Sequence, residues 1–362
     1  MTRLPAWAEY GLIPLLNLSL AFGVAGLVVL AIGENPIEAL NVMIQGAFVY
    51  EGSFGYTLYY TTNFIFTGLA VAVASHARLF NIGGEGQAYL GGLGAILVCL
   101  AFDSWLPSLL LIPLAIAGSA ATGAAWAIIP GWLQAYRGSH IVITTIMFNF
   151  IGAGLMVGLL AGVLMRGGQS NPESREVAEA ARLPYIHDML NAIGFDVANS
   201  PLNLAFPIAL LACVGVWVLI WRTKWGYALR AMGESESAAI YAGIPVKRMI
   251  VVAMAISGAL AGLMAINTVL GAHGKVVLNF PAGFGFTGIA VALMGRSHPV
   301  GIVLAAFLFG ALFQGGTELD FEFQTITREM VLLIQGLIIL FSGALTLMFV
   351  PWIERLIGRG RA

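Results

Sequence analysis

Long, uninterrupted apolar runs are the feature that most constrains how this chain can fold. Most of them reach the roughly 20 residues needed to cross about 30 Å of hydrocarbon. They are continuous rather than alternating, and only helices or closed barrels satisfy their backbone polar groups in lipid, so helices are favoured. The sequence therefore predicts an all-α integral membrane protein of about ten transmembrane helices, at approximately 11–32, 57–75, 84–102, 107–129, 141–165, 201–221, 250–271, 283–295, 299–317 and 329–350.

The composition agrees with a membrane protein and excludes other classes. Hydrophobic residues make up 59% of the 362 residues and charged residues only 10%, against roughly 25% charged in an ordinary soluble domain. The formal net charge of -1 excludes a strongly basic protein that binds a nucleic acid polymer. Cys99 and Cys213 lie inside apolar runs, which argues against a disulfide framework or a thiolate metal site. We expect no cofactor.

The distribution of basic residues predicts the orientation in the membrane. If the N-terminus is cytoplasmic and the loops alternate, 12 of the 17 basic residues lie inside, as the positive-inside rule requires: Arg3, Arg78, Arg137, Arg222, Lys224, Arg230, Lys247, Arg248, Arg296, Arg355, Arg359 and Arg361. Both termini are then cytoplasmic. The first run is too long for a typical signal-peptide core, so we interpret it as a retained helix, with a cleaved signal as the alternative.

Two long loops and one short segment complete the predicted layout. The outer loop, 166–200, is polar enough to carry one or two short helices, and the inner loop, 222–249, is the longest cytoplasmic segment. Residues 35–50 are typical of a short amphipathic helix on the outer surface. No linker or low-complexity tract interrupts the chain, so residues 1–362 are expected to form a single polytopic membrane domain.

Two glycine-interrupted segments occupy corresponding places in the chain. Residues 79–95 follow the second apolar run and residues 280–295 follow the seventh. Such broken segments at matching positions of two halves point to the central site of a transporter. Five helices separate them, which predicts two five-helix halves of opposite topology.

The first of these segments, "LFNIGGEGQAYLGGLGA", places Asn81, Glu85 and Gln87 among six glycines. An ionisable residue inside the membrane is a functional-site hypothesis because its burial is costly. Two interpretations stay open. Glu85 can be an acid at a helix N-terminus, near Arg78, or the glycines can let the helix unwind so that its polar groups line a pathway. The further pathway candidates, each of which can instead serve packing alone, are Asn63, Asn149, Phe284, Phe286 and Thr287.

Enzyme motifs are absent. The five histidines are scattered without the spacing of a metal site, and no G-x-S-x-G nucleophile elbow occurs. The Gly-Lys pair at Lys275 lacks the earlier glycine and the following Ser or Thr of a phosphate-binding loop. If ATP powers transport, another chain must bind it.

The inner loop contains "GESESAAIYAGIP", a pattern that predicts one short helix. Gly233 precedes it, Glu234 and Glu236 lie in its first turn, and Gly243 and Pro245 end it. A helix of about eight residues is not stable alone. It therefore rests either on the chain's own membrane domain or on a soluble motor subunit.

Three segments together carry a resemblance to a known family. The runs "LFNIGGEGQAYLGGLGA", "GYALRAMGESESAAIYAGIPVKRM" and "GFGFTGIAVALMGRSHPVGIVLAAFLFGAL" resemble the permease subunits of bacterial ABC importers of the ribose, nucleoside and branched-chain amino acid group. The resemblance covers roughly residues 36–350. It is strongest to the nucleoside-type permeases that work with a basic membrane lipoprotein as solute receptor.

This resemblance implies partners that the chain itself does not supply. They are an ABC ATPase, a second permease subunit that is a related chain or another copy, and an extracellular or periplasmic solute-binding protein, all at the bacterial inner membrane. The implied substrate is a nucleoside, with ribose or another simple sugar as the alternative. A secondary transporter that uses Glu85 is a more remote class.

The resemblance also assigns roles to residues of this chain. Asn81, Gly83, Glu85, Gly86 and Gln87 match the family signature near the translocation path. The coupling helix that inserts into the ATPase would comprise Gly233, Glu234, Ala238, Ala239, Tyr241, Ala242 and Gly243.

Overall fold

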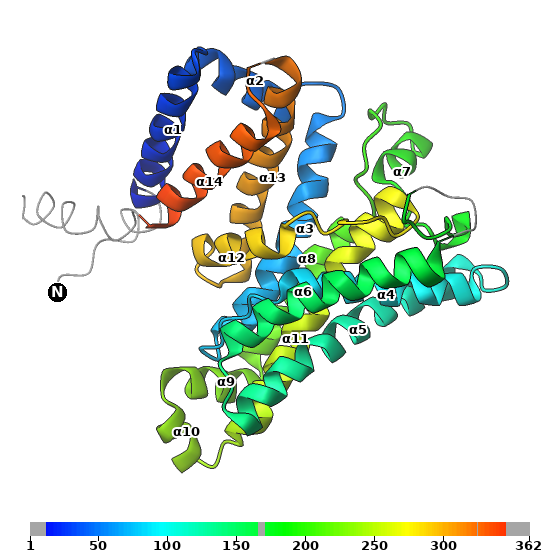
Figure 1. Cartoon of the computed structure of the whole chain (residues 1–362), viewed down its shortest axis with the longest axis vertical. Coiled ribbons are helices and arrows are strands. Elements are labelled where there is room, and N and C mark those ends of the chain that lie inside the picture. The colour runs from blue at the N-terminus through cyan, green and yellow to red at the C-terminus, as the bar shows by residue number, and fades with distance from the viewer. Residues whose placement is uncertain (1–11, 166–170, 324, 345–362) are drawn as a thin grey trace, which may run out of the picture. The chain divides into compact units, whose positions relative to one another are not determined.

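The computed structural model describes residues 12–165, 171–323 and 325–344 (Figure 1). These residues form helices, and the β-bridges among them, Glu173 with Val277 and Tyr185 with Asn203, are isolated. Contacts divide the chain into two compact units. Unit 1 comprises 1–54 and 311–362, and unit 2 comprises 55–310.

Unit 1 contains α1 (Ile13–Ile32), α2 (Pro36–Phe48), the end of α13 (Pro299–Glu322) and α14 (Arg328–Ala344). Helix α2 confirms the short helix predicted over 35–50. Its start is set by Asn35, whose side-chain oxygen accepts a 3.0 Å bond from the Ile37 N–H, and by Pro36 in the first turn. Ala39, Val42 and Met43 form its buried face.

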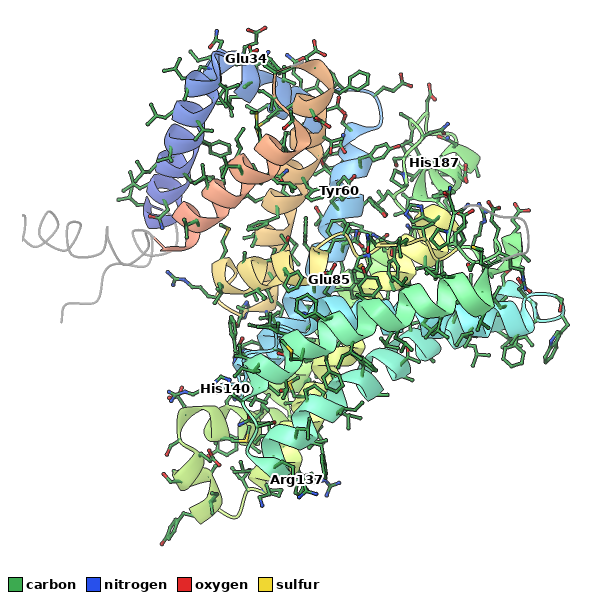
Figure 2. The ribbon with its side chains drawn as sticks, viewed as in Figure 1. Glu34, Tyr60, Glu85, Arg137, His140 and His187 are labelled. Atoms are coloured by element: carbon green, nitrogen blue, oxygen red, sulfur yellow. The ribbon has the colours of Figure 1, made fainter. Side chains whose placement is uncertain are left out.

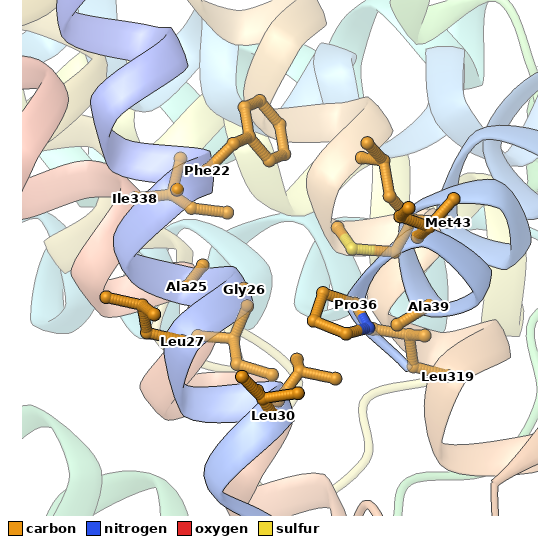
Figure 3. A pocket seen from close by; sticks show the side chains of 15 residues that line it. Phe22, Ala25, Gly26, Leu27, Leu30, Pro36, Ala39, Met43, Leu319 and Ile338 are labelled. Carbon is orange, nitrogen blue, oxygen red and sulfur yellow. The ribbon is translucent and has the colours of Figure 1, made fainter. Parts of the chain in front are cut away.

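An apolar pocket of about 400 Å³ lies inside unit 1 (Figure 3). Helices α1 and α2 supply most of its lining, and α13 and α14 contribute Leu319 and Ile338. The side chains that surround it are aliphatic or aromatic, among them Phe22, Leu27, Leu30, Pro36 and Met43.

Unit 2 carries the helices that position the site. Its membrane-length elements are α3 (Ser53–Ser75), α4 (Gly84–Phe102), α5 (Ser108–Arg137), α6 (Ile141–Leu159) with η2 (Leu160–Leu164), α8 (Ala205–Arg222), α11 (Val246–Ala265) with η4 (Ile266–His273) and the first part of α13. The short α12 (Phe284–Met294) lies between η4 and α13. Helix α3 is the most enclosed span, with 89% of its apolar window buried.

Glycines allow α4, α5 and α11 to pack with their backbones in contact. A Cβ added at Gly91 of α4 would lie 2.4 Å from the Cα of Gly262 in α11, and one at Gly123 of α5 would lie 2.4 Å from the carbonyl oxygen of Gly258. Small residues are what membrane helices use where their axes approach closely. The glycines of these three runs therefore fix the core of unit 2.

Eight helices of the described residues are long and apolar enough to cross a membrane, and α12 is a shorter apolar helix. Their outward faces are apolar, as shown by Phe150, Leu211 and Leu304, each more than 60% exposed. Such a surface suits lipid rather than water. This confirms an all-α membrane protein of about ten helices. The run at 329–350 extends past the described residues, and the relation between the two halves stays a prediction.

The outer loop, for which one or two short helices were expected, carries η3 (Glu179–Ala181) and α7 (Ile186–Ala192). The inner loop contains the predicted short helix, α10 (Glu236–Tyr241), and before it a second helix that was not predicted, α9 (Lys224–Glu234). Glu234 ends α9 and does not lie in the first turn of α10. Ser235 is extended and caps α10 by accepting a bond from the Ala238 N–H.

Gly91→Ala tests the backbone packing of α4 on α11. Its Cβ would meet backbone atoms that cannot rotate away, so we expect a loss of about 2 kcal/mol of stability, seen as a lower melting temperature in detergent. Gly154→Ala in α6 is the matched control, because nothing lies within 4 Å of its Cβ. Equal melting temperatures for the two variants would contradict this packing.

Candidate functional site

Two helices of unit 2 begin at one carboxylate. Glu85 lies in the first turn of α4 and is 8% exposed. Its Oε1 accepts a 2.8 Å hydrogen bond from the Gly283 N–H and its Oε2 a 2.9 Å bond from the Gly285 N–H. These N–H groups belong to the start of α12, where a helix leaves its donors unpaired. Glu85 therefore caps α12 from another part of the chain and lies near the positive ends of two helix dipoles.

The two helix starts touch through their backbones. A Cβ at Gly285 would lie 2.2 Å from the Glu85 nitrogen, and one at Gly84 would lie 3.2 Å from the Gly285 carbonyl oxygen. Any side chain larger than hydrogen at Gly285 would separate α12 from the Glu85 carboxylate. The glycines on either side of the acid are therefore part of the same cap.

Asn81 and Gln87 fold the segment that precedes α4. Asn81 Oδ1 accepts from the Gly83 N–H at 2.8 Å and from Gln87 Nε2 at 3.1 Å. Asn81 Nδ2 donates to Gln87 Oε1 at 2.9 Å and to Ser257 Oγ of α11 at 2.8 Å. Both amides are 1% exposed. The bonds replace those that a continuous helix would have made, so they stabilise an irregular backbone away from water.

Asn149 of α6 caps α4 in the same way that Glu85 caps α12. Its Oδ1 accepts a 2.8 Å bond from the Gly86 N–H, and its Nδ2 donates to the Ile82 carbonyl oxygen at 2.8 Å. Thr145, one turn earlier in α6, accepts from the Ile82 N–H at 3.3 Å. Four of the predicted polar site residues, Asn81, Glu85, Gln87 and Asn149, thus meet at the starts of α4 and α12.

Asn63 belongs to a different hydrogen-bond network. Its Oδ1 accepts from Asn267 Nδ2 of η4 at 2.8 Å, and Asn267 Oδ1 accepts from Asn203 Nδ2 at 2.9 Å. All three amides are fully buried. This network joins α3, η4 and the start of α8. Asn203 and Ser257 also belong to these networks but were not predicted. Nothing in the local sequence around either residue indicates its distant hydrogen-bond partner.

The three residues predicted on α12 have different surroundings. Phe284 is 4% exposed and packs edge-on against Phe64 of α3, with ring centres 5.4 Å apart. Phe286 is 47% exposed. The Thr287 hydroxyl donates a 3.2 Å hydrogen bond to the Gly283 carbonyl oxygen, one turn earlier in the chain. Tyr60, labelled with Glu85 in Figure 2, also faces Phe284, at a ring-centre distance of 6.1 Å.

The predicted coupling residues divide by exposure. Tyr241 is 97% exposed and Ile240 beside it is 58% exposed. Glu234, Ala238, Ala242 and Gly243 are exposed too. Gly233 and Ala239 are buried, so they face the chain itself. Arg78 lies 3.9 Å from Glu234, and this pair, rather than Arg78 with Glu85, is the contact formed.

An ion pair fastens the predicted outer loop to the end of α4. Nη1 and Nη2 of Arg175 donate to Asp103, at 2.7 and 2.8 Å, and the Ala178 N–H adds a 3.0 Å bond. The hydrogen bonds from Arg175 hold the pKa of Asp103 below its usual range. The Asp103 side chain is 5% exposed, so water screens this pair little.

Within residues 12–165, 171–323 and 325–344, no three His, Cys, Asp or Glu side chains gather where they could hold a metal ion. The site is instead a set of amides, one carboxylate and backbone N–H groups around two helix starts.

Residues 53–343 match the family described as branched-chain amino acid transport system / permease component. The chain belongs to this family of permeases.

Curated relatives cover nearly the whole chain. A guanosine ABC transporter permease protein of Bacillus subtilis is 36% identical over 92% of this chain and 93% of its own length. A glucose ABC transporter permease protein of Haloferax volcanii is 32% identical, covering 93% and 88% respectively. A nucleoside ABC transporter permease protein of Lactococcus lactis is 32% identical, covering 91% and 90%.

These matches confirm the resemblance found in the three sequence motifs. Proteins of this family are the transport components of ABC transporters, so the permease is not itself an enzyme, and the family implies a separate ATPase and a solute-binding protein. The part played by each site residue in transport stays a prediction.

Asp103→Asn tests the fastening of the outer loop. Loss of the charge-assisted bonds should cost about 2 kcal/mol and lower the melting temperature of the purified permease at pH 7. Because the folded-state pKa of Asp103 is depressed, the stabilisation is present above its unfolded value near 3.9 and is lost as pH falls through the folded pKa. The difference between wild type and variant should stay constant from pH 5 to 8. A difference that shrinks within that range would contradict the assignment.

Proposed function

We propose that this permease imports nucleosides or related purine and pyrimidine compounds with energy from ATP. The observation that carries the proposal is the 36% identity to the guanosine permease over almost the full length of both chains. The chemistry of the site supports it. The polar groups at the starts of α4 and α12 are neutral amides apart from Glu85, and both oxygens of Glu85 already accept backbone bonds, which suits an uncharged solute.

A simple sugar is the second candidate, because the glucose permease of Haloferax volcanii is also similar over most of its length. Aromatic side chains favour the nucleoside. Phe286, with 47% of its surface exposed, and the half-buried Tyr60 offer faces on which a base can stack, whereas Phe64 and Phe284 are buried against each other.

The pathway candidates take two roles in this proposal. Asn81, Glu85, Gln87 and Asn149 shape the pathway by holding the starts of α4 and α12, since their hydrogen bonds are satisfied within the chain. Asn63 and Phe284, which are buried, likewise support the helices beside it. Phe286 and Thr287 on α12 are the candidates for lining it.

The setting that we propose is the bacterial inner membrane, with both termini in the cytoplasm. The positive-inside distribution of Lys and Arg supports this orientation, and the termini themselves, 1–11 and 345–362, lie outside the described residues. The two units act together as one permease domain. It works with an ABC ATPase, a second permease subunit that is a related chain or another copy, and a solute-binding protein outside.

Substrate competition tests the proposal. The complex of permease, ATPase and solute-binding protein is reconstituted in liposomes, and ATP-driven uptake of labelled guanosine is measured. A hundredfold excess of unlabelled adenosine or guanosine should abolish uptake of the label, and ribose or glucose should leave it unchanged. Uptake of labelled glucose with no uptake of guanosine would instead support the sugar assignment. Inhibition by a protonophore in the presence of ATP would favour a secondary transporter.

Tyr241→Arg tests the docking of the ATPase on α10. The side chain is almost wholly exposed, so the change should leave the permease folded and reduce co-purification of the ATPase at least fivefold. Phe195→Arg in the outer loop, 62% exposed before substitution, is the control and should retain the ATPase. Ala239→Arg is a poorer test, because Ala239 is 2% exposed and the larger side chain would disrupt α10 itself. Full ATPase recovery with Tyr241→Arg would contradict docking at this surface.

A further inference from the structure

His76, directly after α3, lies where three segments of unit 2 meet. Its Nε2 is 3.2 Å from the Ser297 carbonyl oxygen, in the turn after α12. Its ring packs edge-on against Trp221 at 5.1 Å between ring centres. Its own carbonyl oxygen would lie 2.2 Å from a Cβ at Gly233, near the end of α9. One residue therefore contacts the α9 segment, the end of α8 and the turn after α12.

These contacts hold α12 to one segment at both of its ends. At the start of α12, the Gly283 and Gly285 N–H groups bond Glu85. Beyond its last residue, Met294, the Ser297 carbonyl accepts from His76. Residues 76–85 thus form a brace along α12, which at 11 residues is about 16 Å long. A displacement of His76 would be passed to α12 as a whole.

The backbone around this brace adopts conformations that only a supporting structure maintains. In the described part of the chain, the non-glycine residues with positive φ are Arg78, Asn279, Ala282, Arg296 and Ser297. All five lie in the segment after α3 or in the turns that flank α12. Left-handed conformations are unfavourable for such residues and gather at switch regions.

The chemistry of the imidazole fits a fixed hydrogen bond. A carbonyl oxygen only accepts, so Nε2 of His76 must carry the proton. Burial lowers the pKa of His76, which favours the neutral ring near pH 7. The ring of His298 also contacts Trp221, at a tilted angle and with ring centres 5.0 Å apart.

We propose that His76 is a positioning residue for transport, which passes movement of the α9–α10 segment to α12 through its hydrogen bond to Ser297. This inference rests on the proposed docking of the ATPase to α10. Closure of the ATPase shifts α9, the contact at Gly233 shifts His76, and α12 follows because it is bonded to residues 76–85 at both ends.

The test measures coupling in the reconstituted complex of permease, ATPase and solute-binding protein, as nucleoside taken up per ATP hydrolysed. His76→Phe keeps a flat ring against Trp221 and removes the donor. It should retain the ATPase and its hydrolysis but lower this ratio at least fivefold, and His76→Gln, which restores an N–H donor, should recover at least half of it. His140→Phe, an exposed histidine before α6 (Figure 2), is the matched control and should keep the wild-type ratio.

A wild-type ratio in His76→Phe would overturn the inference while leaving the proposed function intact. Failure of the ATPase to co-purify with the wild-type permease would instead remove the proposed function. If His76→Phe does not fold, Gly233→Ala is the second variant. It leaves the imidazole in place and crowds the His76 carbonyl, so it should lower the ratio too, and an unchanged ratio would equally overturn the inference.

Discussion

The Glu85 carboxylate, shared between the starts of α4 and α12, is the interaction on which the organisation of unit 2 depends. A short helix that begins inside a membrane leaves N–H groups without partners, and water is not there to satisfy them. Glu85 supplies both of its oxygens to α12. The same bonds satisfy both carboxyl oxygens inside the protein, which explains how an acid is tolerated in so apolar a chain.

The surrounding residues follow from this cap. Gly84 and Gly285 are required because the two backbones touch, and Asn149 satisfies the Gly86 N–H that α4 leaves unpaired. Asn81 and Gln87 hold the irregular segment before α4. Broken helices whose N-termini face one point are a recurring solution for central sites in transporters. In this permease the point that they face is occupied by the carboxylate of Glu85.

Much of the fold could be predicted from the sequence, because the apolar composition and the length of a segment are enough to identify a membrane-spanning helix. Each of the ten apolar runs overlaps a helix in the described residues, with the run at 329–350 continuing past them, and the short run at 283–295 is α12. The polarity of Asn81, Glu85 and Gln87 also marked the site. Their partners could not be predicted, since Glu85 and Gly285 are 200 positions apart and nothing local links them. The sequence analysis did not predict that the inner loop divides into α9 and α10. It did not identify Ser235 as the N-cap residue of α10.

Hydrogen exchange measured by mass spectrometry tests the central claim, that Glu85 holds the start of α12, most directly. The permease and its Glu85→Ala variant are compared in detergent, with peptides resolved over residues 280–290 and over α8 as an internal reference. Loss of the cap frees the Gly283 and Gly285 N–H groups, so exchange over 282–287 should rise at least tenfold in the variant while α8 stays unchanged. Equal protection of the start of α12 in both proteins would contradict the account.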